Sequence, residues 1–187
     1  MKIAFRPLTP EHWQDFELLF GERGACGGSW CMFWKKPRKQ FHAEVYEKNH
    51  LDQIRMVDEG VIPGILAYVD GQPLGWCGFE PRENYFALSR SRILKPIDDK
   101  PVWSVTCFFV DKKFRKQGVT VALLKEVLEY VSSKGGRIVE GYPVEVVGDK
   151  VPDPFIFTGT ATAYKQAGFV EVVRRSATRP IFRYIIK

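Results

Sequence analysis

A nearly continuous apolar run at residues 102–110 constrains the fold of this chain more than any other feature. The run reads Val-Trp-Ser-Val-Thr-Cys-Phe-Phe-Val, and its β-branched and aromatic residues favour a strand. A strand that is apolar at almost every position has to be covered on both faces, which places it in the middle of a sheet. Nine residues are also too few to cross a bilayer as a helix. The run therefore predicts a central strand in a layered protein.

The segment after this run predicts a basic loop followed by an amphipathic helix. Apolar residues recur at helical spacing between Val119 and Val131, and Gly135-Gly136 ends the pattern. Such a strand-loop-helix unit brings unpaired backbone N–H groups and the positive end of the helix to one place. That combination binds phosphate groups. The loop has neither the spacing of a nucleotide-hydrolysing P-loop nor that of a dinucleotide-binding fold.

The remaining predicted elements are short and are separated by proline and glycine. They are a strand at 3–6, a helix opening at Thr9 and ending at Gly21, a glycine-rich and aromatic segment at 24–34, a helix at 41–59, a hairpin of strands 65–69 and 74–79, a strand at 137–143, a proline-rich loop to Pro154, a helix at 158–166, and strands at 169–174 and 181–186. This order predicts an α/β (α+β) fold with a mixed, largely antiparallel central sheet flanked by helices. The length of 187 residues, without internal repeats, predicts a single domain spanning 1–187.

The composition is that of a globular protein with an excess of positive charge. Hydrophobic residues make up 45% and charged residues 27%, which is enough apolar material for a core and excludes a disordered tail. The net charge of +6 favours an anionic partner, whether a nucleic acid, an acidic membrane surface or a phosphate-bearing small molecule. Arg6 and Pro7 interrupt the apolar stretch that a signal peptide would need, so we expect a soluble, cytoplasmic protein that binds no membrane.

The four cysteines predict neither a disulfide framework nor a metal site. They form no Cys-x-x-Cys pair, and Cys77 and Cys107 lie in apolar runs that predict buried free thiols. Cys26 and Cys31, with a histidine nearby, are a weak match to a zinc site because no second cysteine pair accompanies them. No histidine and aspartate are placed to activate a cysteine nucleophile. We therefore expect no metal.

Two segments resemble the GNAT N-acetyltransferase superfamily. Arg115-Lys116-Gln117-Gly118-Val119-Thr120 is similar to its acetyl-CoA signature, Arg/Gln-x-x-Gly-x-Gly/Ala, although Lys112 and Thr120 stand where proline and a second small residue are usual. Threonine is still small enough to leave its amide accessible. Tyr164-Lys165-Gln166-Ala167-Gly168-Phe169 resembles the Tyr-x-x-x-Gly-Phe segment of the same superfamily. The asparagine that often precedes that tyrosine is absent, because Phe157 stands there, so its contacts cannot be transferred to this chain.

The resemblance implies a fold, a cosubstrate and a reaction. It implies a sheet splayed between its fourth and fifth strands, with the pantetheine arm of acetyl-CoA in the opening. The residues implied to bind acetyl-CoA are those at the end of the central strand and in the loop after it: Phe108, Phe109, Val110, Arg115, Lys116, Gln117, Gly118, Val119 and Thr120. The implied reaction is direct attack of an acceptor amine on the thioester in a ternary complex. Tyr164 is the implied general acid that protonates the departing thiolate.

The general base and the acceptor site stay open at this stage. Glu80, Asp111 and Glu140 are candidate bases, and Ser104 or Thr106 could hold a water that relays the proton. Trp30 and Trp34, together with Phe33, could form an aromatic wall for the amine, and Glu80 is placed with them as a substrate-binding residue. Ordinary core anchoring explains the same aromatic residues equally well. The acceptor is a small-molecule or protein amine.

Three classes of function are compatible with the sequence. The favoured one is an acetyl-CoA-dependent N-acetyltransferase, and the alternative is a catalytically silent CoA-binding module that acts as a sensor or scaffold. A nucleic-acid-binding protein would use the positive charge, but the basic residues do not interleave with aromatic residues on one strand face, so no nucleic acid is expected. The oligomeric state is open, a homodimer included.

Overall fold

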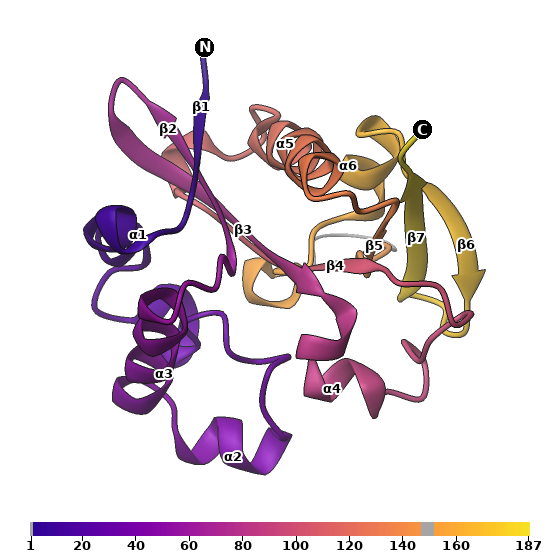
Figure 1. Cartoon of the computed structure of the whole chain (residues 1–187), viewed down its shortest axis with the longest axis horizontal. Coiled ribbons are helices and arrows are strands. Elements are labelled where there is room, and N and C mark those ends of the chain that lie inside the picture. Colours follow the sequence, from indigo (N-terminus) through magenta and orange to yellow (C-terminus); the bar gives the residue numbers. More distant parts are fainter. Residues whose placement is uncertain (1, 147–151) are drawn as a thin grey trace.

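A computed structural model describes residues 2–146 and 152–187 of the chain (Figure 1). The described residues form one seven-stranded sheet with the order β1-β2-β3-β4-β5-β7-β6. Its strands are β1 (Ala4–Pro7), β2 (Gly64–Val69), β3 (Gln72–Pro81), β4 (Trp103–Val110), β5 (Ile138–Gly141), β6 (Val170–Arg174) and β7 (Pro180–Ile185). Neighbouring strands are antiparallel except β4 and β5, which are parallel. The predicted mixed, largely antiparallel sheet is therefore confirmed.

Helices cover both faces of the sheet. They are α1 (Trp13–Phe20), α2 (Arg38–Ala43), α3 (Glu47–Asp58), α4 (Phe86–Ser89), α5 (Val119–Ser133) and α6 (Ala161–Gln166). Helices α5 and α6 pack together over one face, and α1 packs on β3 from the opposite face, with α3 beside it (Figure 1). The apolar stripe of α5 explains this placement, because residues such as Leu123, Val127 and Val131 are fully buried against the sheet.

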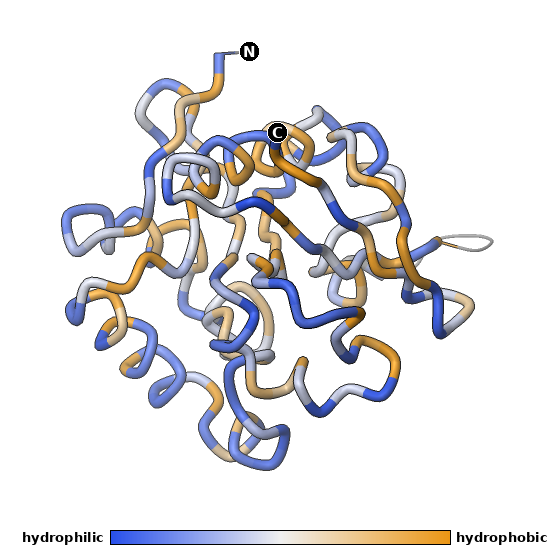
Figure 2. The backbone as a smooth tube through the Cα atoms, turned by 45° about the vertical axis from the view of Figure 1, so that its right-hand side comes forward, coloured by the Kyte–Doolittle hydropathy of each residue, from blue (hydrophilic) through white to orange (hydrophobic). Residues whose placement is uncertain are grey.

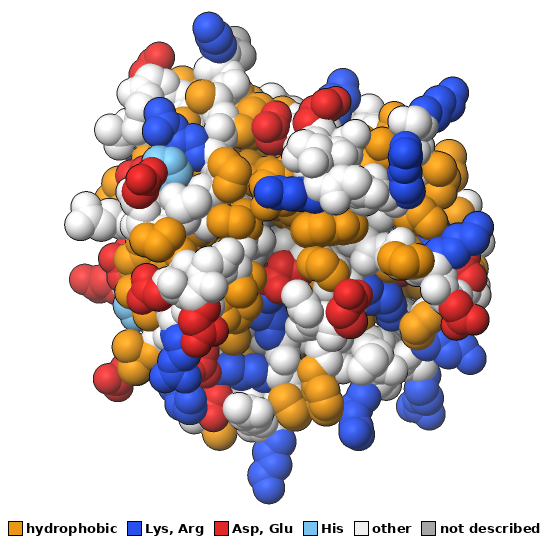
Figure 3. Space-filling view, viewed as in Figure 1, with side chains coloured by type: hydrophobic (Ala, Val, Ile, Leu, Met, Phe, Trp, Pro, Cys, Tyr) orange, Lys and Arg blue, Asp and Glu red, His pale blue; other side chains and the backbone are white. Residues whose placement is uncertain are grey.

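Strand β4 is covered on both faces, as its apolar run predicts. Val105 and Phe108 lie in the core under α5, whereas Phe109 faces the opposite core and its ring lies 5.4 Å from that of Phe20. Figure 2 shows hydrophobic and hydrophilic stretches alternating along the backbone. Figure 3 shows Lys and Arg scattered over one face rather than gathered in one patch. No helix within residues 2–146 and 152–187 has the length and apolarity to cross a membrane.

The single helix predicted at residues 41–59 is wrong. The chain forms two helices, α2 and α3, which are separated at Tyr46, where φ is 68°. The Tyr46 N–H donates to the Gly28 carbonyl at 3.0 Å, so a contact with the glycine-rich segment takes the place of a helical hydrogen bond. Tertiary structure overrides helical periodicity here.

Other predicted elements agree with the structure more closely. The hairpin of β2 and β3 turns at Asp70-Gly71, and both residues have positive φ. The N-terminal helix starts later than predicted, because a 3-10 turn at Pro10–His12 precedes α1 and the Thr9 side chain makes no capping hydrogen bond. Part of the predicted loop to Pro154, residues 147–151, lies outside the described residues.

Candidate active site

The sheet opens between β4 and β5. The two strands pair only from Trp103 to Val105, opposite Val139 to Gly141. Strand β4 then continues to Val110 without β5 beside it. Because this parallel pairing is so short, the backbone of β4 beyond Val105 has no neighbouring strand on the side of β5. The splayed sheet implied by the sequence resemblance is therefore present.

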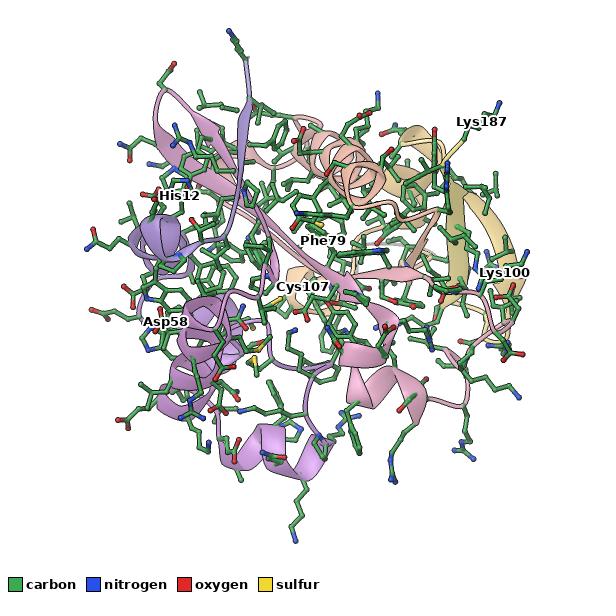
Figure 4. The ribbon with its side chains drawn as sticks, in the orientation of Figure 1. His12, Asp58, Phe79, Lys100, Cys107 and Lys187 are labelled. Carbon is green, nitrogen blue, oxygen red and sulfur yellow. The ribbon has the colours of Figure 1, made fainter. Side chains whose placement is uncertain are left out.

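A β-bulge in β4 lies next to this opening. Cys107 pairs with Gly78, and the next pair along β3 joins Phe79 to Val105, so Thr106 is the extra residue on β4. Phe79 belongs to the core under α5 and Cys107 packs on the opposite core, and Figure 4 shows both near the centre of the molecule. The Thr106 hydroxyl is buried, lies near the Tyr85 hydroxyl, and makes no hydrogen bond of normal geometry in the described part of the chain.

Backbone groups of Phe108 and Val110 point toward the opening. The Asp111 N–H donates to the carbonyl of Leu74 in β3 at 2.9 Å. Backbone groups of successive residues in a strand point to opposite sides, so those of Phe108 and Val110 point away from β3. On the side of the opening, the Phe108 N–H donates to the Phe157 carbonyl at 2.6 Å, and the Val110 carbonyl accepts from Arg115 Nε at 3.0 Å.

This alternation leaves the Phe108 carbonyl and the Val110 N–H as an acceptor and a donor two residues apart. Neither has a partner among residues 2–146 and 152–187. An extended chain with amide groups can pair with such an edge as an added strand does. Phe109, predicted in the same group, differs because its backbone pairs with Trp76 of β3.

The loop between β4 and α5 is shaped for an anion. The Asp111 carboxylate accepts from the Lys113 N–H at 2.8 Å and caps a 3-10 turn at Lys112–Phe114. Gly118 then precedes the helix with φ 81°, and a Cβ built there would meet nothing within 4 Å. The first backbone hydrogen bond of α5 runs from the Ala122 N–H to the Gly118 carbonyl at 3.0 Å.

The N–H groups before Ala122 in α5 therefore have no acceptor within the helix. They belong to Val119, Thr120 and Val121 and point out of the helix start, where the helix dipole is positive. The side chain of Gln117 donates to the Lys113 carbonyl at 2.8 Å and closes the loop on itself. Together these groups can hold a phosphate group.

Tyr164 lies at the inner end of the opening. Its helix, α6, begins at Thr160, whose hydroxyl accepts from the Ala163 N–H at 3.3 Å. The Tyr164 side chain is fully buried, and its hydroxyl has no partner within the described residues. Burial, followed by the nearby Cys77 and Tyr142 groups, raises the pKa of Tyr164 well above its ordinary value.

Two glycines make room for the Tyr164 ring. A Cβ at Gly141, the last residue of β5, would overlap the ring and lie 2.6 Å from the hydroxyl oxygen. A Cβ at Gly159 would lie 2.9 Å from the other side of the ring and 3.0 Å from the ring of Phe108. The phenol therefore sits between the end of β5 and the exposed edge of β4.

A row of buried polar residues crosses the sheet face opposite α5. Glu80 of β3, Ser104 of β4, Glu140 of β5 and Arg183 of β7 are successive partners across the strands. All four are buried, with exposures of 2%, 0%, 0% and 7%. Buried charges need partners, so the contacts of each carboxylate decide which of them is available for chemistry.

Glu140 is fully engaged in this row. Its Oε1 accepts from Arg82 at 2.9 Å and from the Tyr142 hydroxyl at 2.7 Å, and its Oε2 accepts from Arg183 at 2.7 Å. The Ser104 hydroxyl in turn lies 2.7 Å from the Tyr142 hydroxyl. Glu140, predicted as a candidate base, therefore lies in a structural ion cluster.

Glu80 is paired as well. Its Oε1 accepts from Lys35, and its Oε2 accepts from Asn84 at 2.9 Å. The Lys35 ammonium also lies 5.0 Å from the centre of the Tyr85 ring. Asp111, the third candidate carboxylate, caps the 3-10 turn in the loop before α5.

The aromatic segment divides between two places. Phe33 and Trp34 lie 5.5 Å and 6.4 Å from the ring of Phe157, whose carbonyl contacts β4 at the opening. Trp30 is instead 7% exposed and stacks on Phe20 in the core under α1. The structure thus brings Trp34, but not Trp30, toward the opening.

The four cysteines are free thiols. Cys77 is buried as predicted, Cys107 is only partly buried, and the Cys31 sulfur accepts from the Trp76 indole at 3.3 Å. No three His, Cys, Asp or Glu side chains gather as metal ligands in the described residues.

Sequence reasoning missed three contributors to the opening. The sequence identifies Phe157 only as the residue in place of an asparagine, and it does not single out Lys35. The bulge at Thr106 has no local signal, because it depends on the register with β3. In the sequence, only Gly141 and Gly159 indicate that another group packs closely against the backbone here, and that group is the Tyr164 ring.

Comparisons with known proteins agree with this architecture. The model of the acetyltransferase (GNAT) family matches residues 29–142. An acetyltransferase of the GNAT family from Streptococcus agalactiae is 15% identical, with 99% of this chain and 96% of that chain covered and a TM-score of 0.57. PaiA N-acetyltransferase from Thermoplasma acidophilum, solved with coenzyme A, is 16% identical, with 100% of both chains covered and a TM-score of 0.54.

A third similar structure is that of NAA60 from Arabidopsis thaliana in complex with acetyl-CoA. It is 17% identical, with 99% of this chain and 100% of that chain covered and a TM-score of 0.51. No curated protein matches the sequence. At these identities the structural likeness establishes the fold.

Proposed function

The chain belongs to the acetyltransferase (GNAT) family, and on that premise we propose that it transfers the acetyl group of acetyl-CoA to an amine. The observation that carries the proposal is the buried Tyr164 hydroxyl, which has no partner in the described residues and lies beside the opening between β4 and β5. The acceptor is an amine of a small molecule or a protein. The amine attacks directly in a ternary complex, so no covalent acyl-enzyme forms.

The chemistry of the opening fits acetyl-CoA. The loop at residues 115–120 and the start of α5 offer outward N–H groups for the pyrophosphate, and Gly118 leaves open space in front of them. The Phe108 carbonyl and the Val110 N–H are spaced to pair with the amides of a pantetheine arm. The orphaned Tyr164 hydroxyl offers a partner for the sulfur.

Tyr164 acts as the general acid in this proposal. Acetyl-CoA, when bound, supplies an acetyl group activated as a thioester. As the new carbon–nitrogen bond forms and the carbon–sulfur bond breaks, Tyr164 donates its phenolic proton to the sulfur. Because burial raises the pKa of Tyr164, the hydroxyl retains its proton until the thiolate develops.

Thr106 handles the proton that the amine loses. The oxygens of Glu140 and Glu80 are paired, and the Asp111 carboxylate caps the loop. The Thr106 hydroxyl is buried and unpaired within the described chain, at a bulge next to the opening. We assign it the task of orienting a water that accepts the amine proton and passes it to solvent.

Transfer of labelled acetyl groups to a panel of amines tests this function. The panel combines amino acids, polyamines, aminoglycosides and lysine-containing peptides, and a thermal shift with CoA measures binding separately. We expect transfer to at least one amine and an increase in melting temperature with CoA. A shift with CoA and no transfer to any amine would support the catalytically silent alternative. No shift with CoA would contradict both.

A further inference from the structure

Arg179 carries a positive charge that has no carboxylate partner among residues 2–146 and 152–187. It precedes β7 in the hairpin from β6 and is half-buried. Its Nη1 donates to the Thr158 hydroxyl at 2.9 Å and reaches the Tyr142 carbonyl at 3.5 Å. Across residues 2–146 and 152–187, neither Nε nor Nη2 of this guanidinium has a hydrogen-bond partner. The Nε and Nη2 edge of the guanidinium is therefore available to donate hydrogen bonds to a ligand.

Arg183, on the strand that follows Arg179, is by contrast a guanidinium paired with carboxylates. Burial acts to lower the pKa of Arg183, yet hydrogen bonds with Asp98 and Glu140 raise it overall. For Arg179, burial lowers the pKa, and no carboxylate in the described part of the chain opposes this effect. A partly buried cation that contacts only neutral groups loses hydration, which costs free energy. An anion that binds from outside the chain would offset this cost.

The position of Arg179 links it to the opening. Thr158 lies between Phe157, which contacts β4, and Gly159, which abuts the Tyr164 ring. Tyr142 directly follows Gly141, which abuts the same ring from the end of β5. Both partners of Arg179 are thus sequence neighbours of the residues that enclose the Tyr164 phenol.

We propose that Arg179 binds an anionic oxygen group, a carboxylate or a phosphate, on the acceptor amine. The free Nε and Nη2 edge matches the two oxygens of such a group. This inference rests on the proposed acetyl transfer and defines its acceptor as an amine that carries a negative charge, such as an amino acid.

Matched pairs of acceptors test the inference. Glycine, β-alanine and γ-aminobutyrate are compared with their carboxamides, and phosphoethanolamine with ethanolamine, so that the carboxylate and phosphate arms are separate. For the preferred anionic acceptor, Arg179→Gln should raise KM about 10- to 100-fold, the range of one charged hydrogen-bonded contact, and leave kcat within about twofold. Arg179→Lys should recover part of the loss, and the neutral partners should be unaffected.

Arg175→Gln is the control variant. Arg175 lies in the same hairpin, and its guanidinium donates to the Lys95 and Pro96 carbonyls at 2.6 Å and 3.2 Å. Removing this charge should leave the preference for anionic acceptors intact. An equal effect of both variants, or a loss of acetyl-CoA affinity in Arg179→Gln, would overturn the assignment. So would equal use of anionic and neutral acceptors by the wild type.

A binding measurement separates this inference from the proposed function. The N-acetylated products of the same amines are titrated into the CoA-loaded protein, which requires no catalysis. Wild type should bind the anionic products at least tenfold more tightly than their carboxamides, and Arg179→Gln should lose this difference. If the neutral amines are acetylated but no product shows the difference, acetyl transfer stands and the role of Arg179 fails.

Discussion

At the residue scale, the Tyr164 hydroxyl is the sharpest test of the proposed mechanism. Tyr164→Phe keeps the ring between Gly141 and Gly159 and removes only the proton donor. We expect single-turnover acetyl transfer to slow by about 10²- to 10⁴-fold, the usual contribution of general acid catalysis, while acetyl-CoA still binds. Tyr130→Phe is the control, because the Tyr130 ring on α5 packs on Phe79 of β3, with ring centres 5.2 Å apart. An unchanged chemical step would leave Tyr164 as a packing residue.

The pH dependence of transfer provides a second prediction at this scale. The raised pKa of Tyr164 means that the phenol stays protonated through its ordinary titration range near 10. Activity should therefore rise with pH as the acceptor amine deprotonates, and should not fall through ionisation of Tyr164 below pH 10. The kcat profile of the wild type from pH 6 to about 10 measures this. A decline that disappears in Tyr164→Phe would contradict the prediction.

Some residues of the candidate site could be predicted from the sequence and others could not. Tyr164 follows from a local pattern, since helix, glycine and strand are consecutive in the chain. Trp30 and Trp34 share one aromatic segment, but positive φ angles at Trp30 and Cys31 reverse the backbone between them and send the two rings to different cores. Arg179 could not be distinguished from other surface arginines, because its missing partner is visible only in three dimensions.

At the element scale, the start of α5 predicts how CoA affects stability. A ligand that binds only the folded state at a hundredfold excess over its Kd adds about 2.7 kcal/mol. Gly118→Asp should abolish this gain, because it puts a carboxylate in the open space in front of the helix start. Gly135→Asp is the matched control at the other end of the helix, where φ is also positive and the space is also open. Thermal unfolding with and without CoA measures both.

Equal loss of the CoA effect in the two variants would contradict this assignment. The element itself is one that sequence predicts well, because the apolar stripe and the Gly135-Gly136 end are local signals. The helix predicted at 41–59 was wrong for the opposite reason. Its break at Tyr46 depends on a hydrogen bond to Gly28, which is distant in sequence.

At the scale of the whole molecule, the ion cluster around Glu140 joins the two halves of the sheet. Strands β4 and β5 share only three residue pairs, so the contact of Glu140 on β5 with Arg82, which follows β3, adds a second connection between the halves. Glu140→Ala should destabilise the protein by about 3–5 kcal/mol, because it leaves two buried guanidinium groups without this partner. Urea unfolding monitored by tryptophan fluorescence measures the loss.

Glu171→Ala is the control for charge removal alone. Glu171 pairs with Arg174 on the exposed β6 edge, and exposed pairs contribute about 0–1 kcal/mol. A similar small loss for Glu140→Ala would show that the halves are held by the apolar cores alone. Sequence indicated the sheet and its apolar cores, but the polar row across β3, β4, β5 and β7 depends on strand register, which a single amino-acid sequence does not reveal.

The exposed edge of β4 also bears on how freely this protein can change over evolutionary time. Phe108 and Val110 face the opening with main-chain groups, which every residue except proline provides in full. The proposed binding of the pantetheine arm therefore places almost no demand on their side chains, and substitution at these two positions is limited by the volume available under α5. Proline at position 110 is the one substitution that would remove the backbone N–H facing the opening.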